Sequence, residues 1–168
     1  MKNKQTVWIA RIAIMAALYV VLTLISYPFS YCLIQFRISE VLMLLCFYNK
    51  KYIPSVTIGC LLSNIISTVD PFDMLFGTLA TLIAAVIMSF IKNRIISSII
   101  PVVVNALIVG VELWYFLKEP LLLCIGSVAL GEIVVVMILG NVLFYFLEKN
   151  NHFNELVGIN NNQITSEK

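Results

Sequence analysis

The feature that most constrains this chain is a series of long apolar stretches separated by short breaks. They cover residues 7–26, 52–69, 72–91, 95–117 and 121–147. An α-helix needs about 20 apolar residues to cross the hydrocarbon core of a bilayer, and each stretch meets or approaches that length. Charged residues make up only 12% of the chain, about half of their share in a soluble domain. The sequence therefore predicts an all-α integral membrane protein.

A sixth, shorter apolar segment covers residues 38–48. It has to cross the membrane if the charged turn after it, with Lys50 and Lys51, lies opposite the loop before it. We count it as a short second helix whose polar outer end lies inside the protein. Six transmembrane helices are then expected to form one compact bundle over residues 1–149, because no linker or change in composition divides this part of the chain.

The distribution of lysine and arginine predicts the orientation, because these residues mark the cytoplasmic side of a membrane protein. With the N-terminus inside, only Arg37 and Lys118 of the 11 lysines and arginines fall outside. Both termini are therefore predicted to be cytoplasmic, in a multi-pass protein of the cell membrane. Residues 150–168 are polar and rich in asparagine, and they are expected to form a loose cytoplasmic tail.

Polar side chains within the apolar segments gather at a similar depth. At about 1.5 Å of rise per helical residue, the outer half of the membrane and its centre contain Arg37, Glu40, Asn64, Asp70, Asp73, Asn105, Glu112 and Glu132. A carboxylate at such a depth is costly unless it is paired or hydrated, so it normally faces a cavity or a partner. We therefore predict a polar pocket that opens to the outside and is lined mainly by hydrogen-bond acceptors. Such a pocket suits a ligand rich in N–H donors.

Several of these residues also have a purely structural interpretation. Asp70 and Asp73 fit a turn and the N-cap of the next helix. Arg37 and Glu40 fit an ion pair between positions i and i+3 at a helix start. Glu112 lies close enough to the membrane surface to be hydrated.

Helix packing accounts for Asn64 and Asn105 more easily than for Glu132. Asn64 and Asn105 fit hydrogen bonds between helices, which are common in membrane bundles. Glu132 lies near the midplane, where no water is expected, and it follows Gly131, which permits a close approach. A cavity is therefore the favoured environment for Glu132.

The first outer loop, residues 26–37, is rich in aromatic side chains and too apolar for a plain solvated connection. It is expected to fold over the pocket as a lid. Tyr31 and Phe36 are candidates for stacking on a flat ring in the ligand.

Small residues in the first helix suggest a docking surface. Ala10, Ala13 and Ala17 lie at spacings that let another helix approach closely, although packing within the bundle is the alternative. The chain has no GxxxxGK[ST] nucleotide loop, and its residues form no metal, haem or nucleophile constellation. We therefore expect no enzymatic activity and no bound metal. A binding pocket on a chain without an ATPase motif implies one of two things. Either a partner supplies the energy for transport, or the ligand passes through without an energy source.

Five motifs, taken in order, resemble one family of membrane proteins. They are QFRISE (35–40), GCLLSN (59–64), DMLFGTLATLIAA (73–85), PVVVNAL (101–107) and GE (131–132). Together they are similar to the QueT family, the substrate-binding S components of energy-coupling-factor (ECF) transporters for queuosine precursors. The resemblance extends from Ala10 to about Leu147.

The resemblance implies a six-helix S component that captures a 7-deazaguanine outside the cell. It also implies an association with a membrane-embedded T subunit and two cytoplasmic ATPases, which would hydrolyse the ATP. The S component would then release its ligand by toppling in the bilayer. The alanines of the first helix would meet the T subunit. No cofactor and no nucleic acid are expected on this chain itself.

The chemistry of such a ligand suggests roles for the polar residues. Glu132 or Glu40 would accept hydrogen bonds from the guanine-like edge, and Asn64 and Asn105 would bind other heteroatoms. Arg37 would bind the O6 atom of the ligand or orient Glu40. A second carboxylate such as Asp73 would neutralise the ammonium group of an aminomethyl ligand.

Two other classes of function remain open. A small self-standing channel or proton-linked carrier would use the same carboxylates as an ion path and would transport without ATP. A membrane assembly factor would use the polar residues only to hold its helices together, and it would bind no small molecule.

Overall fold

The computed structural model describes residues 2–27, 36–67 and 71–158, and these ranges contain helices and short connections but no strand. The elements in chain order are α1 (Lys2–Ile25), the 3₁₀ helix η1 (Ile38–Met43), α3 (Leu44–Tyr48), the 3₁₀ turn η2 (Lys50–Tyr52), α4 (Ile53–Ser67), α5 (Pro71–Met88), α6 (Arg94–Leu117), α7 (Leu121–Glu132), the π-helix η3 (Ile133–Gly140), α8 (Asn141–Leu147) and α9 (Asn151–Val157). The all-helical prediction is confirmed.

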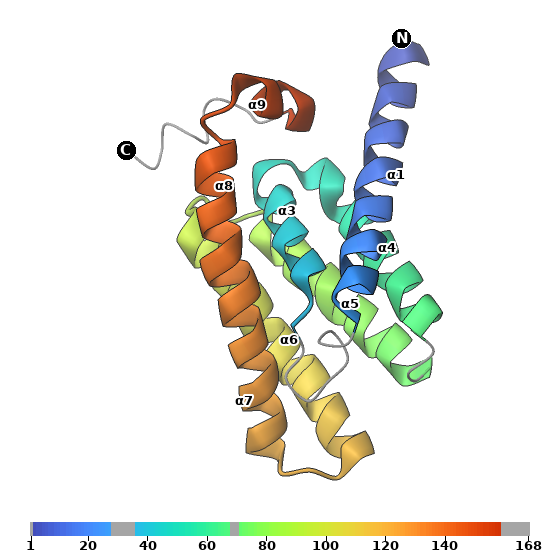
Figure 1. The fold of residues 1–168 in the computed structure, drawn as a ribbon, viewed down its shortest axis with the longest axis vertical. Coiled ribbons are helices and arrows are strands. Elements are labelled where there is room, and N and C mark those ends of the chain that lie inside the picture. The colour runs from blue at the N-terminus through green and yellow to red at the C-terminus, as the bar shows by residue number, and fades with distance from the viewer. Residues whose placement is uncertain (1, 28–35, 68–70, 159–168) are drawn as a thin grey trace.

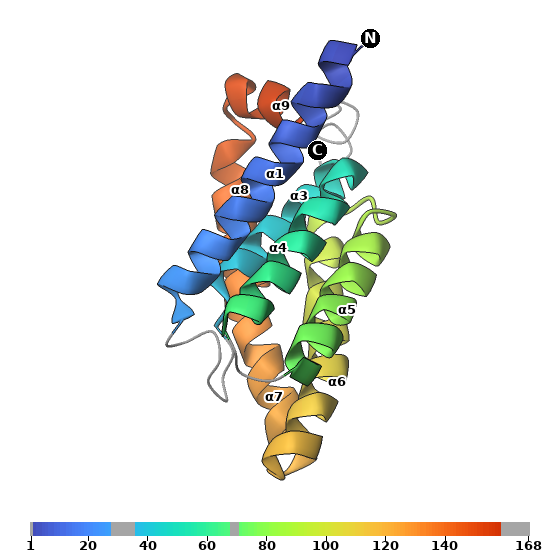
Figure 2. The same cartoon turned by 90° about the vertical axis from the view of Figure 1, so that its right-hand side faces the viewer.

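The long helices form a curved row in which sequence neighbours pack side by side (Figure 1). α4 packs between α1 and α5, and α6 packs between α5 and α7. Figure 2 shows this order along one face of the molecule, from α1 through α4 to α5. The continuous rod α7–η3–α8 runs back along α6 and completes the row.

The short segment η1–α3 fills the centre of this row. It contacts α1 and η3 through η1, and α5 and α6 through α3. Apart from Ile38, which is 42% exposed, its apolar side chains are almost completely buried, with Met43, Leu44 and Cys46 at 0% exposure. A helix that is apolar on all sides is stable only where protein or lipid surrounds it. The prediction that the polar outer end of this segment lies inside the protein is confirmed by Ser39 and Glu40, which are 0% and 2% exposed.

Three helices among the described residues are long and apolar enough to cross a membrane: Gln5–Ile25, Arg94–Leu117 and Leu121–Leu147. Ile38–Tyr48 and Met74–Met88 are apolar but shorter. The start of α1 and the C-terminal α9 lie at one end of the bundle, and the α6–α7 connection lies at the other (Figure 1). Six crossings and cytoplasmic termini therefore stay predictions.

Two glycines allow the close helix contacts that hold the row together. A Cβ atom at Gly110 of α6 would lie 2.8 Å from the Ile125 Cα atom of α7, and one at Gly59 of α4 would lie 2.7 Å from the Tyr19 Cβ atom of α1. Backbone atoms cannot yield in the way a flexible side chain does. Gly110 therefore fixes how closely α6 and α7 approach each other.

The beginning of the tail is more ordered than the sequence suggests. The expectation of a loose end is wrong for residues 151–157, which form the capped helix α9. The Phe153 ring lies 6.0 Å from the Phe144 ring, measured between centroids, and Val157 is 1% exposed. The Asn49 side-chain amide also donates to the Val157 carbonyl at 3.2 Å. Phe153 and Val157 are four residues apart and share one helical face, which gives this polar segment enough apolar surface to dock.

Candidate functional site

A small polar cavity lies where η1, α5, α6 and α7 meet. Its lining consists of Arg37, Glu40, Gly77, Thr81, Asn105, Val109 and Glu132. Four of these residues are predicted ligand-binding residues, and all four are buried: Arg37 is 6% exposed, Glu40 2%, Asn105 4% and Glu132 7%. Four of the eight polar residues that the depth argument places together therefore converge on one cavity, although they are far apart in the sequence.

One side of the cavity is formed by a contact between α6 and α7. The Asn105 side-chain amide donates to the Glu132 Oε1 atom at 2.6 Å. The Glu132 Oε2 atom and the Asn105 Oδ1 atom are also buried, and within the described ranges neither receives a hydrogen bond. The contact thus holds the carboxylate in place, while one oxygen of each side chain stays available to accept a hydrogen bond from a ligand.

The opposite side of the cavity is formed by Glu40, which is held from α1. The Tyr19 hydroxyl donates to the Glu40 Oε1 atom at 2.5 Å. Beside it, the Thr23 hydroxyl donates to the Ser39 hydroxyl at 2.7 Å. The Glu40 Oε2 atom is buried, and no donor in the described part of the chain reaches it. Tyr19 is absent from the predicted site, although a tyrosine in the middle of an apolar span signals that its hydroxyl needs a partner.

The site has a strong bias toward hydrogen-bond acceptors. Three buried acceptor atoms, on Glu40, Asn105 and Glu132, lack a donor in the part of the chain that the structure describes. A buried polar atom left unsatisfied costs roughly 1–3 kcal/mol. When they are ionised, the two carboxylates carry one more charge than the Arg37 guanidinium balances. The arrangement therefore suits a ligand that brings N–H donors or a positive charge.

The cavity is nearly closed in this conformation. Its free volume is about 10 Å³, which is close to the minimum for one water molecule. Gly77 and Thr81 of α5 form one wall, and the Thr81 hydroxyl donates to the Gly77 carbonyl at 3.0 Å. Their spacing favours helix packing when the sequence is considered alone, and nothing in it marks them as lining a cavity. A flat heterocycle enters only after the surrounding helices or side chains separate.

Two predicted residues are buried close to the cavity but do not line it. Asn64 of α4 is 3% exposed, and its amide lies 3.6 Å from the Cys60 Sγ atom. The Thr81 hydroxyl contacts the same sulfur at 3.3 Å, so Cys60 lies between Asn64 and the cavity wall. Glu112 is 7% exposed and lies about two helical turns beyond Asn105 on α6. It is therefore less hydrated than the sequence suggests.

The remaining predicted residues are only partly described. Phe36 is half-buried and packs against the main core. Asp73 belongs to the first turn of α5, and the placement of its side chain is not described. Tyr31 and Asp70 lie outside the described residues.

The three alanines proposed for docking lie on the exposed face of α1. Ala10, Ala13 and Ala17 are all exposed. By contrast, Ala16 is 5% exposed and faces α4, where its carbonyl lies 3.1 Å from the Cβ position of Gly59. One side of α1 is thus used for packing within the bundle, and the alanine face is separate from it.

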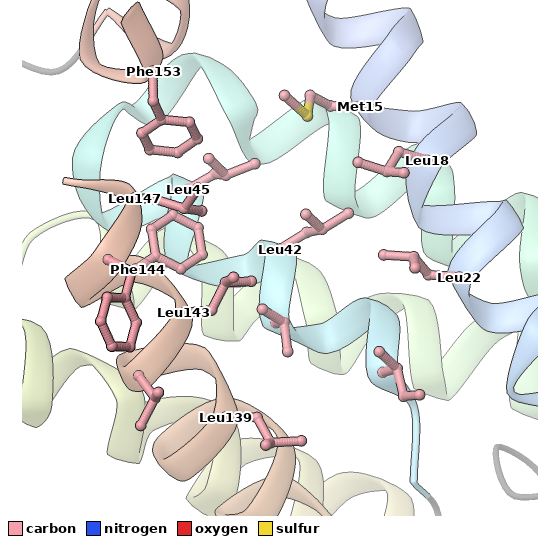
Figure 3. A pocket seen from close by; sticks show the side chains of 14 residues that line it. Met15, Leu18, Leu22, Leu42, Leu45, Leu139, Leu143, Phe144, Leu147 and Phe153 are labelled. Atoms are coloured by element: carbon pink, nitrogen blue, oxygen red, sulfur yellow. The ribbon is translucent and has the colours of Figure 1, made fainter. Parts of the chain in front are cut away.

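A much larger cavity, of about 660 Å³, lies between α1, η1–α3, α8 and α9 (Figure 3). Only apolar side chains line it, among them Met15, Leu42, Leu139, Phe144 and Phe153. It offers no hydrogen-bond partner to a polar ligand. Despite its size, it is therefore a weaker candidate for the ligand site than the polar cavity.

The described residues contain no cluster of His, Cys, Asp or Glu that could hold a metal ion. Cys46, Cys60 and Cys124 are buried free thiols. Cys32 lies outside the described residues. The polar side chains that line the cavity are two carboxylates, an amide, a guanidinium and the Thr81 hydroxyl.

Comparison with known proteins identifies the family. Residues 9–149 match the family model described as QueT transporter. A protein from Lactococcus lactis subsp. cremoris (strain MG1363), named Queuosine precursor transporter QueT, is 36% identical over 154 residues, which cover 82% of this chain and 90% of that protein. No solved structure matches significantly. The family consists of transporters and not enzymes, and this chain belongs to the QueT transporter family.

Proposed function

We infer that the chain is the substrate-binding S component of an ECF-type importer and that it captures a queuosine precursor from outside the cell. Membership of the QueT transporter family and the name of the Lactococcus relative support the class of substrate. The observation that carries the proposal is the set of three buried acceptors, on Glu40, Asn105 and Glu132, that lack a donor among the residues described.

A 7-deazaguanine supplies the groups that these acceptors lack. Its N1–H and exocyclic amine form a pair of parallel donors that one carboxylate accepts at both oxygens. Glu132 is the first candidate for this role, and Glu40 is the second. The O6 atom of the ligand needs a donor, as at guanine in DNA, and the Arg37 guanidinium of the same cavity supplies one.

The other predicted residues belong to the open form of the site. Asp73 is proposed to neutralise the ammonium group of an aminomethyl ligand, with Glu112 as an additional acceptor. Asn64 is proposed to bind a further heteroatom when α4 and α5 separate. Tyr31 and Phe36 are proposed to stack on the flat ring as the first loop closes.

The energy for uptake is proposed to come from other subunits. The exposed face of α1 with Ala10, Ala13 and Ala17 is proposed to bind a T subunit. Two cytoplasmic ATPases would hydrolyse ATP. This arrangement agrees with a chain that has no nucleotide-binding loop. It also requires the six crossings and the cytoplasmic termini that the charge distribution predicts.

Calorimetric titration of the purified chain tests the ligand. The aminomethyl, cyano and queuine forms of 7-deazaguanine are compared with guanine under the same conditions. Saturable binding of one deazaguanine, with guanine weaker, supports the proposal and identifies the ligand. Absence of binding to every form contradicts it.

Reconstitution tests the source of energy. The chain is placed in liposomes with and without an ECF module, and uptake of the ligand is followed with ATP inside. Uptake that needs both the module and ATP supports the S component. Uptake by the chain alone identifies a self-standing carrier instead.

A further inference from the structure

The rod that carries Glu132 contains an unusual helical winding directly after this residue. Residues Ile133–Gly140 form the π-helix η3, with α7 before it and α8 after it. In a π-helix the backbone hydrogen bonds close at i+5, and such segments are rare, short and often found at functional sites. An eight-residue π segment beside the proposed ligand site therefore calls for a physical explanation.

Polar contacts join this rod to α6 on both sides of the π-helix. Before η3, the Asn105 amide donates to Glu132 at 2.6 Å. After η3, the Asn141 amide donates to the Ser98 hydroxyl at 2.9 Å, and the Arg94 Nε atom donates to the Asn141 Oδ1 atom at 3.1 Å. The rod is thus fixed to α6 at the site and again farther along.

The residue counts between these contacts do not match for two ordinary α-helices. Ser98 and Asn105 are seven residues apart on α6, whereas Glu132 and Asn141 are nine residues apart on the rod. At 1.5 Å per residue, these separations are about 10.5 Å and about 13.5 Å. The two contacts would then be out of register by about 3 Å. A π-helix has more residues in each turn, which shortens the rod and brings both contacts into register.

The second contact is part of a larger cluster, which we call the polar clamp: Tyr48, Arg94, Ser98, Asn141 and Glu148. Arg94 forms an ion pair with Glu148 at 2.7 Å, and it donates to the Tyr48 hydroxyl at 3.1 Å. The Tyr48 hydroxyl in turn donates to Glu148. Partly buried ionic groups of this kind keep their favourable energy only when their partners stay in place.

The polar clamp joins both segments that carry the site carboxylates. Tyr48 is the last residue of the segment η1–α3, and Glu40 lies near the first residue of that segment. Asn141 follows the π-helix, and Glu132 precedes it. Arg94 of α6 contacts both Tyr48 and Asn141. The positions of Glu40 and Glu132 relative to α6 are therefore set from one cluster away from the cavity.

We propose that Asn141 and the π-helix η3 are positioning elements for the ligand site, because they hold the Glu132 carboxylate in register with Asn105 so that its second oxygen stays available in the cavity. This proposal rests on the proposed function for the identity of the ligand. It assigns no ligand contact to Asn141. The effect of Asn141 on ligand affinity is exerted through Glu132.

The sharpest test shortens the π segment and leaves the residues that line the cavity unchanged. Deletion of Ile138, which is 52% exposed, removes one of the two residues by which the rod exceeds α6 between the contacts, and it therefore disturbs the π winding. The matched control, Ile138→Ala, removes the side chain and keeps the residue count. The deletion is expected to weaken ligand binding about tenfold to hundredfold, since the loss of one hydrogen bond to a charged group changes an affinity by about this factor. The control is expected to bind like the original chain.

Asn141→Leu tests the contact itself, and Ser98→Ala is a milder variant that removes the acceptor together with the bond that the hydroxyl donates to the Ile95 carbonyl. Both are expected to weaken ligand binding while thermal unfolding shows an intact fold. In a Glu132→Gln background, Asn141→Leu is expected to add no further loss, because a positioning residue has nothing left to position. A loss that is the same in both backgrounds would overturn the proposal.

A measurement without ligand separates this proposal from the proposed function. The infrared band of the Glu132 carboxyl group is identified by its loss in Glu132→Gln. This band is expected to shift in Asn141→Leu and in the Ile138 deletion, and to stay in place in Ile138→Ala. An unshifted band in both variants contradicts the positioning role even if the ligand binds. A shifted band supports it even if no deazaguanine binds.

Discussion

At the scale of single residues, the site depends on how each carboxylate uses its two oxygens. Glu132 and Glu40 each have one oxygen fixed by a neighbouring side chain, Asn105 and Tyr19 respectively. The other oxygen of each is buried and lacks a donor among the described residues. Orientation by one oxygen and availability of the other is what recognition of a ligand with several N–H groups requires.

The change Glu132→Gln tests this division of roles. The amide that replaces the carboxylate presents an N–H group where the ligand needs an acceptor, so most of the binding affinity should be lost. Calorimetric titration with the deazaguanine measures the effect. Glu119→Gln, at an exposed carboxylate in the α6–α7 connection, is the matched control and should bind normally. Equal affinity in the two variants would remove Glu132 from the site.

The change Tyr19→Phe tests the support of Glu40. It leaves the Glu40 Oε1 atom without its 2.5 Å donor, which should lower the free energy of unfolding by about 1–3 kcal/mol and weaken ligand binding. Denaturation and titration measure the two effects. Tyr145→Phe, at a half-exposed ring, removes the same hydroxyl group from the surface and should change neither quantity. An equal effect of Tyr145→Phe would indicate that loss of any tyrosine hydroxyl destabilises the protein, and it would assign no specific role to Tyr19.

At the scale of the elements, close helix contacts place the side chains of the site. α6 and α7 approach each other so closely at Gly110 that a Cβ atom there would overlap the backbone of Ile125. This contact lies on α6 between Asn105 and the end of the helix, and it helps to set the distance at which Asn105 meets Glu132. Helix spacing, and not the loops, therefore determines the geometry of the polar cavity.

The pair Gly110→Ala and Gly126→Ala tests this role of helix spacing. The first substitution forces α6 and α7 apart and should lower the free energy of unfolding by roughly 1–3 kcal/mol, with weaker ligand binding. The second adds a methyl group where no atom lies within 4 Å, so it should be neutral. Thermal unfolding and titration compare them. A neutral Gly110→Ala would show that the interface yields and that spacing is set elsewhere.

At the scale of the whole molecule, a row of helices surrounds the short buried segment η1–α3. The start of α1 and α9 share one end of this bundle, opposite the α6–α7 connection (Figure 1). An even number of crossings agrees with that arrangement and with the placement of lysine and arginine. It predicts that the α6–α7 connection faces the outside of the cell and that α9 faces the cytoplasm.

Labelling of single cysteines measures this topology. Glu119→Cys should react with a membrane-impermeant maleimide in intact cells, whereas His152→Cys should react only after the membrane is permeabilised. Both positions are exposed, so a difference between them reports the side of the membrane. The background chain carries serine in place of its natural cysteines. The reverse pattern would invert the predicted orientation, and labelling of both in intact cells would show that the rod α7–η3–α8 does not cross the membrane.

The amino-acid sequence by itself determined the helical class, the position of each apolar segment and the family, because these depend on local composition and on ordered motifs. It also determined that Glu40 and Glu132 need partners, because a carboxylate in an apolar segment is costly wherever the helices lie. Only the tertiary structure decided which partners they have. Tyr19 reaches Glu40, and Gly77 and Thr81 reach the cavity wall, only because helices distant in the sequence pack together. The π-helix and the docking of α9 likewise depend on register and contacts between distant residues, and such contacts exist only once the chain has folded.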